Sequence, residues 1–143
     1  MRLKIFLISF ITFLFSFSAY SQCRDFTEKY LIPELGDYLL NGRYHSFKMK
    51  EGDEILIFKT LNTGIKYKFI VGADTQLPDN IIFIVKDWNN KIIFDNRQSK
   101  AKEFEYQPDK AERIKIYIQI PQLNDPPHDG CVGLVIGMKK VEL

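Results

Sequence analysis

The sequence is poor in the residues that most enzymes use as nucleophiles, bases and metal ligands. It has 2 cysteines and 2 histidines among 143 residues, and after Ser21 its only serines are Ser46 and Ser99. Neither serine lies in a Gly-x-Ser-x-Gly elbow. The chain also has no HExxH zinc motif, no EF-hand loop and no glycine-rich loop for phosphate. We therefore expect a protein that is not an enzyme and has no resident cofactor.

An excess of charge of one sign is also missing. The chain carries 20 basic and 18 acidic residues, and removing Arg2 and Lys4 with the leader described below makes the two signs equal. Proteins that bind nucleic acid usually present a basic surface. The balanced charge therefore argues against a nucleic-acid partner, and it argues equally against an anionic membrane surface as the main target.

The first residues have the three parts of a secretory signal peptide. Arg2 and Lys4 are basic, Ile5 to Phe17 is an apolar run too short to span a bilayer comfortably, and Ala19-Tyr20-Ser21 fits the small-x-small pattern of a cleavage site. We predict cleavage after Ser21. The expected product is one secreted or periplasmic domain over residues 22–143, with residues 1–21 as the signal peptide and no membrane span after cleavage.

The two cysteines, Cys23 and Cys131, are too far apart for a CxxC redox motif or a zinc pattern. In an exported protein an even count of cysteines predicts a disulfide. The bridge would tie the start of the mature chain to its last strand, and closing so long a loop contributes about 4–5 kcal/mol in the chain-entropy view. Lipidation of Cys23 is the alternative, but Gln22 is not the small residue that a lipoprotein signal needs before its cysteine.

After about residue 43, apolar and polar residues alternate with a period of two, which is typical of β-strands. Turn signals separate the runs, and no helix lies between them to make a parallel crossover. We therefore predict an all-β fold, an antiparallel β-sandwich that is jelly-roll-like with about eight strands. The expected strands are Arg43–Met49, Glu54–Leu61, Ile65–Val71, a hairpin over Ile81–Asn96, Lys102–Gln107, Glu112–Pro121 and Cys131–Val141.

One short helix is predicted before the strands, over about Asp25–Ile32, where apolar residues recur at helical spacing before Pro33. The hairpin raises a packing question because it is apolar on both faces. Two answers stay open for Ile82, Ile84 and Ile93: they lie under the N-terminal helix, or they form an exposed strip that binds a partner. Monomers seldom leave such strips bare.

Four segments make the chain similar to small secreted β-sandwich proteins of Gram-negative bacteria: YLIPELGDYLLNGRY, FKTLNTGIKYKF, VKDWNNKIIFDN and GCVGLVIG. More coarsely, Tyr67-Lys68-Phe69 and the turn Asp87–Lys91 resemble the corresponding parts of bacterial pre-peptidase C-terminal and related jelly-roll modules. The resemblance implies a β-sandwich and export. It brings no established activity and no catalytic residues.

Binding is the function that the composition leaves open. Trp88 at the expected hairpin tip, Tyr117 and Tyr44 are expected to point outward. Flat aromatic side chains of this kind stack on sugar rings or anchor a protein partner. We therefore predict an exported, non-catalytic module of the envelope or exterior, with a binding or structural role and a protein or glycan as partner.

Loop carboxylates carry the remaining alternatives. Asp125 and Asp129 in the segment NDPPHDG, or Asp74 and Asp79 in an earlier loop, offer the oxygen ligands that calcium prefers. His128, between Asp125 and Asp129, adds an imidazole nitrogen that could also bind a metal. The loop carboxylates and His128 are also the groups from which a small hydrolase would build its site. A small hydrolase is therefore the alternative function.

Overall fold

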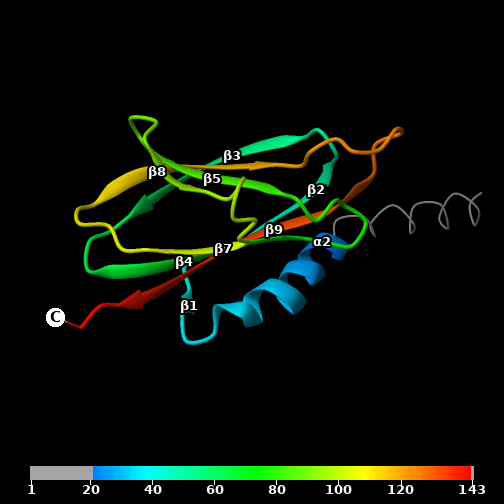
Figure 1. The fold of residues 1–143 in the computed structure, drawn as a ribbon. Coiled ribbons are helices and arrows are strands. Elements are labelled where there is room, and N and C mark those ends of the chain that lie inside the picture. Colours follow the sequence, from blue (N-terminus) through cyan, green and yellow to red (C-terminus); the bar gives the residue numbers. More distant parts are fainter. Residues whose placement is uncertain (1–20, 143) are drawn as a thin grey trace, which may run out of the picture.

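The structure, a computed structural model, describes residues 21–142 as two β-sheets packed face to face, with a helical segment lying on one of them (Figure 1). Apart from Ser21, the predicted signal peptide lies outside the described residues. Within the described part, no helix is long and apolar enough to cross a membrane.

Nine strands make up the sandwich in residues 21–142, and all of their pairings are antiparallel. One sheet, here called the helix sheet, contains β1 (Leu39–Leu40), β2 (His45–Lys50), β9 (Asp129–Lys140), β4 (Ile65–Ala73) and β7 (Glu103–Tyr106). The other, here called the open sheet, has the order β3 (Glu54–Leu61), β8 (Glu112–Gln119), β5 (Ile82–Asp87) and β6 (Ile92–Asp95). The predicted all-β antiparallel sandwich is confirmed.

The core lies between the sheets and is built by alternate residues of each strand, because successive side chains of a strand point to opposite faces. The clearest case is β8 and the residue after it, whose four alternate isoleucines, from Ile114 to Ile120, are fully buried. From the helix sheet, β4 contributes Tyr67, Phe69 and Val71, and β9 contributes Val132, Leu134 and Ile136.

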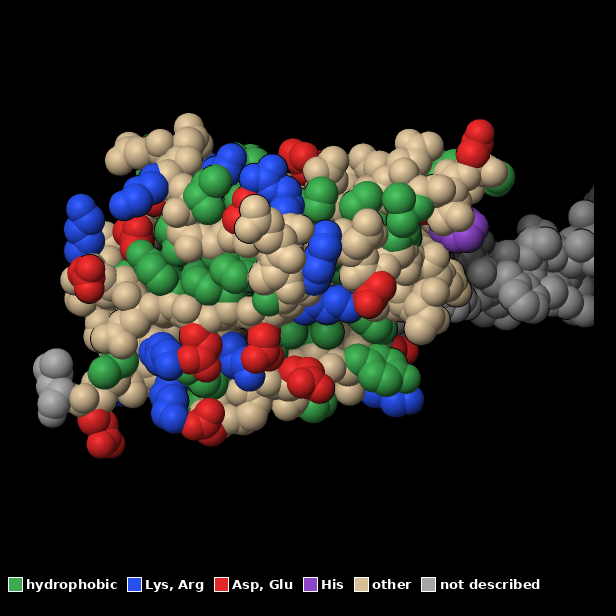
Figure 2. All heavy atoms as spheres, in the orientation of Figure 1, with side chains coloured by type: hydrophobic (Ala, Val, Ile, Leu, Met, Phe, Trp, Pro, Cys, Tyr) green, Lys and Arg blue, Asp and Glu red, His purple; other side chains and the backbone are tan. Residues whose placement is uncertain are grey.

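The seam between the two sheets is closed on one side by aromatic rings. Phe94 of β6 stacks on Phe104 of β7, with ring centroids 4.5 Å apart, and each ring also contacts a core phenylalanine, Phe83 or Phe69. Figure 2 shows hydrophobic side chains along this seam. The two edge strands thus join the layers through side chains rather than through backbone hydrogen bonds.

The chain before the strands forms one continuous helical segment, as predicted, although it is longer than expected. It consists of an α-helical part, α2 (Ser21–Phe26), a π-helical part, η2 (Thr27–Leu31), and a 3₁₀ turn, η3 (Ile32–Leu35). Leu31 and Leu35 pack on Ile70 of β4 and Val135 of β9, on the outer face of the helix sheet.

The first of the two alternatives, in which this helix covers the hairpin, is therefore wrong. Ile82 and Ile84 belong to β5 of the open sheet, on the far side of the sandwich from α2 (Figure 1). Ile93 packs instead against the core between the sheets, because a shift in register between β5 and β6 turns it inward. Of the strip in the second alternative, Ile82 and Ile84 remain, half-buried on the outer face of the open sheet.

Glycine residues of β4 and β9 explain why the helical segment packs on the helix sheet. A Cβ atom added at Gly72 or Gly133 would lie within 2.6 Å of the side chain of Leu31, and one added at Gly137 would lie 2.7 Å from Tyr38. Only residues without side chains let the helical backbone approach this closely. These glycines of β4 and β9 form a smooth track, and Leu31 sits between two of them.

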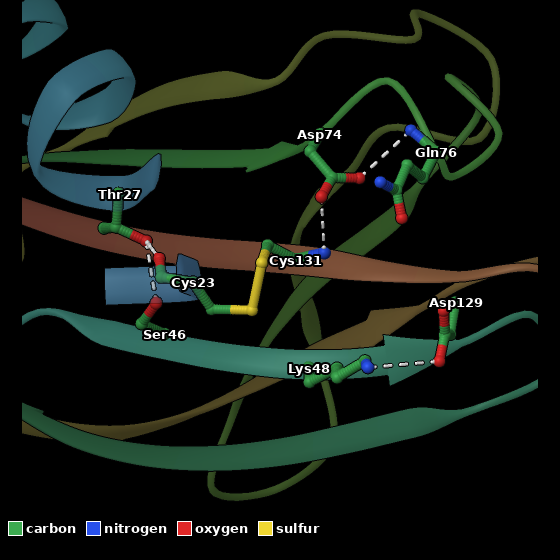
Figure 3. Close-up of a disulfide and its surroundings, with 8 residues drawn as sticks. All are labelled: Cys23, Thr27, Ser46, Lys48, Asp74, Gln76, Asp129 and Cys131. Carbon is green, nitrogen blue, oxygen red and sulfur yellow. Dashed lines mark hydrogen bonds and ion pairs between the residues drawn. A yellow bond between two sulfur atoms is a disulfide. The ribbon is translucent and has the colours of Figure 1, made fainter. Parts of the chain in front are cut away.

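The predicted disulfide is confirmed, and it fixes the start of the same helical segment. Cys23 of α2 is bonded to Cys131 of β9 across a sequence separation of 108 residues (Figure 3). Beside the bridge, the Thr27 hydroxyl donates to the Cys23 carbonyl oxygen at 3.1 Å and lies 3.0 Å from the Ser46 hydroxyl on β2. The disulfide and the glycine track therefore both hold the helical segment against the helix sheet.

Gly133→Ala tests this contact. The added methyl group meets Thr27 and Leu31, and overpacking of this kind costs about 1–3 kcal/mol of unfolding free energy. Urea unfolding gives the cost. It should shrink when the same change is made in a Thr27→Ala, Leu31→Ala background, because the clashing atoms are gone. An equal cost in both backgrounds would contradict the glycine-track explanation.

Candidate functional site

The outer face of the open sheet carries large apolar side chains that no element of the described chain covers. Leu56 and Phe58 on β3 and Trp88 after β5 are 43%, 46% and 52% exposed. Soluble monomers rarely expose such groups in one contiguous area. We call this surface the open face, and its members are Leu56, Phe58, Ile82, Ile84, Trp88, Ile92 and Tyr117 with the basic residues Lys86, Arg113 and Lys115.

Strand register sets these side chains in rows. Tyr117 of β8 lies between Leu56 of β3 and Ile84 of β5, which makes an apolar row across three strands. In the next row Lys115 lies between Phe58 and Lys86. Directly paired residues of neighbouring strands lie close enough for their side chains to touch. The open face is therefore a rigid surface built on a sheet rather than on loops.

Cations lie over the aromatic rings of this face. The Arg113 guanidinium is 4.8 Å from the centroid of the Trp88 ring and 5.1 Å from that of Phe58. The Lys115 ammonium is 5.0 Å from Trp88, and the Lys86 ammonium is 4.8 Å from Tyr117. Each contact of this kind contributes about 0.5–1 kcal/mol at an exposed site. Together they order the rings and the cations with respect to each other.

The two outer faces of the sandwich treat charge differently. On the helix sheet, Lys66 pairs with Glu105 and Lys68 with Glu103, so that blue and red side chains alternate over the lower layer in Figure 2. On the open face, the three basic residues form no ion pair with any residue from 21 to 142. Arg113 and Lys115 therefore carry positive charge that no ion pair of the described residues neutralises.

Acids of the adjoining hairpin already have partners. Asp95 on β6 accepts hydrogen bonds from both the Nε and the Nη2 of Arg97, and these bonds hold the pKa of Asp95 below its ordinary value. Asp87 accepts the backbone N–H of Lys91 at 2.9 Å and so shapes the turn that carries Trp88. Asp95 also interacts electrostatically with Lys86, but it forms no ion pair with Arg113 or Lys115.

Of the three aromatic residues predicted for a binding surface, the structure brings two together. Trp88 and Tyr117 lie on the open face, but Tyr44 lies on the helix-sheet side, packed against the cluster beneath the helix. Its hydroxyl accepts a hydrogen bond from Arg24 at 2.9 Å and donates one to Glu28. Tyr44 therefore anchors the helical segment and is not part of the candidate site.

Sequence reasoning missed Leu56, Phe58 and the three basic residues. In β3 both faces are apolar, because Ile55 and Ile57 alternate with Leu56 and Phe58, and the pattern alone does not say which face is bare. For β8 the signal was present. Arg113 and Lys115 alternate with fully buried isoleucines, so their outward direction follows from the period of two.

The loop carboxylates do not converge on a metal. Asp129 pairs with Lys48 at 3.4 Å, and Asp79 pairs with Lys102. Asp74 accepts the backbone N–H groups of Gln76 and Cys131 (Figure 3). Among residues 21–142 no group of three His, Cys, Asp or Glu side chains is placed to hold a metal ion. The predicted calcium site, with ligands from Asp125, His128 and Asp129, is not confirmed.

The surroundings of His128 also lack the arrangement that hydrolysis needs. The shallow depression that His128 lines contains one carboxylate, that of Asp129, and this carboxylate is engaged by Lys48. Glycoside hydrolysis requires two carboxyl groups that face a common substrate. The described residues give no support to the hydrolase alternative at this loop.

A carboxylate that sequence reasoning overlooked holds this loop together. Glu51, 4% exposed, accepts hydrogen bonds from Leu123 N at 3.0 Å, from Asn124 N at 3.2 Å and from Asn124 Nδ2 at 2.9 Å, and also from the backbone N–H of His128. Burial raises the pKa of Glu51, but these four hydrogen bonds outweigh burial and keep it below its ordinary value. Glu51 is therefore structural.

Fold and surface together define an antiparallel β-sandwich with one outer face covered by a helix and the other bare, aromatic and basic. No protein-family model matches the chain, and no curated protein is similar to it in sequence. Its fold is similar to the crystal structure of PliG from Aeromonas hydrophila, a periplasmic lysozyme inhibitor of g-type lysozyme. The TM-score is 0.50 with 10% sequence identity, over 68% of this chain and 85% of that one.

Glu51 makes stability depend on pH. Because its folded pKa is lower than its unfolded pKa, the folded state binds fewer protons, and the stabilisation is present above the unfolded value and lost as the pH falls through the folded one. In Glu51→Gln the new amide N–H₂ faces backbone donors. We expect a lower urea midpoint at pH 7 and a smaller further loss below about pH 4.3, the ordinary value for glutamate.

The control is Glu54→Gln, which changes an exposed carboxylate a few residues away. This variant should lose unfolding free energy at low pH in the same way as the wild type. A Glu51→Gln protein with the wild-type pH profile would refute the structural role of Glu51.

Trp88 is the only tryptophan in the sequence, so its fluorescence reports on the open face alone. Because Arg113 and Lys115 lie over the ring, iodide should quench it more strongly than caesium, and added salt should reduce the difference. Arg113→Ala should reduce the difference between quenching by iodide and quenching by caesium. Lys140→Ala, which removes an exposed cation of β9, should leave this difference unchanged. Equal quenching by the two ions in the wild type would rule out a local positive potential.

Proposed function

We propose that this protein is an exported, non-catalytic module that binds a protein partner outside the cytoplasm through the open face. The observation that carries the proposal is the contiguous exposure of Leu56, Phe58 and Trp88 on a rigid sheet, beside the half-buried Tyr117, with no element of the described chain to cover them. Aromatic and arginine side chains are the residues most enriched at the energetic centre of protein interfaces.

Export is supported by two independent features. The first residues have the composition of a signal peptide, and the Cys23–Cys131 bridge belongs to an oxidising compartment such as the periplasm or the exterior. We place the protein there. The fold likeness is compatible with this, since PliG is described as periplasmic.

The likeness also supplies one defined partner to try. PliG is described as an inhibitor of g-type lysozyme, which means that a sandwich of similar topology serves as a protein-binding inhibitor. At 10% identity the likeness supports the fold and does not transfer the target. A g-type lysozyme is therefore the first protein to titrate against this chain, before a wider search.

Site-specific crosslinking tests the proposal even while the partner is unidentified. A photoreactive amino acid placed at Leu56, on the open face, should give a discrete protein adduct in the native envelope fraction. The same group at Leu123, an exposed leucine in the loop that follows β8 and not a member of the open face, should not. Trp88→Ala should remove the adduct, because loss of a central aromatic anchor costs about 2 kcal/mol, or roughly thirtyfold in Kd.

Adducts from both positions, or an adduct that persists in Trp88→Ala, would count against binding through the open face. Folding of each variant is checked by urea unfolding, which should be close to wild type because these side chains point away from the core.

A further inference from the structure

Arg113 is built to receive an anion. Its guanidinium is held against the rings of Trp88 and Phe58, yet no hydrogen bond or ion pair engages it within residues 21–142. A guanidinium has five N–H donors in a planar fork that matches a carboxylate. Because the two rings already order this side chain, less conformational entropy is lost when an anion binds.

Two further cations lie within the same surface. The Lys115 ammonium donates to Asn90 Oδ1 at 2.8 Å while it lies over Trp88, and Lys86 is adjacent to Lys115 in the strand register. The acid of β3 that shares this face, Glu54, pairs with Gln119 at the other end of the strand. Positive charge and exposed aromatic surface therefore coincide at one end of the open face.

Charge argues against a second copy of this chain as the occupant. In a symmetric dimer whose twofold axis passes through the basic end of the open face, the three cations of one copy would face those of the other. Like charges brought together at an interface cost several kcal/mol.

Ring occupancy argues against a neutral glycan. Sugars stack on the open faces of aromatic rings, but Trp88 and Tyr117 already have cations over them. A sugar would have to displace these cations, whereas a carboxylate would bind to them in place.

We propose, resting on the binding function above, that the partner presents an acidic protein segment whose aspartate or glutamate carboxylate binds the Arg113 fork. Lys115 and Lys86 neutralise neighbouring acids of that segment, and Phe58, Leu56 and Tyr117 receive its apolar side chains. Charge pairs of this kind raise the association rate and fix the partner's orientation. The apolar row supplies the area that excludes water around them.

Selection from a random peptide library on the purified protein tests the partner's chemistry. The enriched peptides should be rich in Asp and Glu with at least one large apolar residue. As synthetic peptides they should change Trp88 fluorescence and bind less tightly as NaCl is added. Arg113→Ala should weaken them about tenfold or more, as expected for a lost hydrogen bond to a charged group. Lys140→Ala should leave their Kd unchanged.

The outcomes separate this inference from the proposed function. Peptides without acidic residues that still require Trp88 and Phe58 would overturn the acidic partner and leave the binding face intact. Enriched peptides that are indifferent to Trp88, Phe58 and Arg113, or no enrichment at all, would count against both. Heparin, used as a polyanionic probe, should bind more weakly than the best peptide; tighter, Arg113-dependent heparin binding would overturn the inference in favour of an anionic polysaccharide.

Discussion

The close contact between the N-terminal helical segment and the glycine track of β4 and β9 is the constraint on which the rest of the molecule depends. Leu31 reaches the sheet only because Gly72 and Gly133 have no side chains, and the Cys23–Cys131 bond keeps the two surfaces together in the folded chain. A sandwich has two outer faces, and residues 21–142 contain one helical segment to cover them. Because the helical segment packs on the helix sheet, no other element of residues 21–142 covers the open face, and the composition of that face has to be compatible with water.

Placing cations over aromatic rings is one physical solution to that requirement. Lysine and arginine keep their charged ends in water while covering apolar surface, so Arg113, Lys115 and Lys86 hydrate a face that would otherwise be an aggregation hazard.

Two edge strands, β3 and β6, also belong to this sheet. Inward-pointing charge is a known device against edge-to-edge pairing, and Lys59 provides it. It lies on the core-facing side of β3, opposite Ile114, and reaches the Asn41 carbonyl oxygen.

The sequence pattern predicted the sandwich because the alternation of apolar and polar residues can be recognised within each strand separately. The isoleucines from Ile114 to Ile120 and the run from Val132 to Ile136 each identify a core face without reference to other strands. The disulfide was predictable because the chain has only two cysteines and its first residues predict export. The helix position did not follow, because Gly133 and Gly137 read equally well as weak strand residues until the packing partner is known. Only part of the open face could be predicted from the sequence. Trp88 and Tyr117 were identified, but Leu56 and Phe58 were not, since only the three-dimensional arrangement decides which apolar face of β3 is buried.

Glu51 shows why the loop around His128 was wrongly considered for a metal or hydrolase site. The letters EGDE, from residue 51, suggest a solvated turn, and NDPPHDG suggests a loop with free acids. In the folded chain the first of these acids is the buried one, and its carboxylate receives the N–H groups of Leu123, Asn124 and His128. A buried polar group must find hydrogen-bond partners, so the carboxylate and the loop satisfy each other. The backbone around His128 is thereby committed to the scaffold, whereas the donors of Arg113 on the open face remain unengaged by the described chain. Unsatisfied donors held in fixed positions are what a binding surface offers, and this contrast is the physical reason to assign binding to the open face.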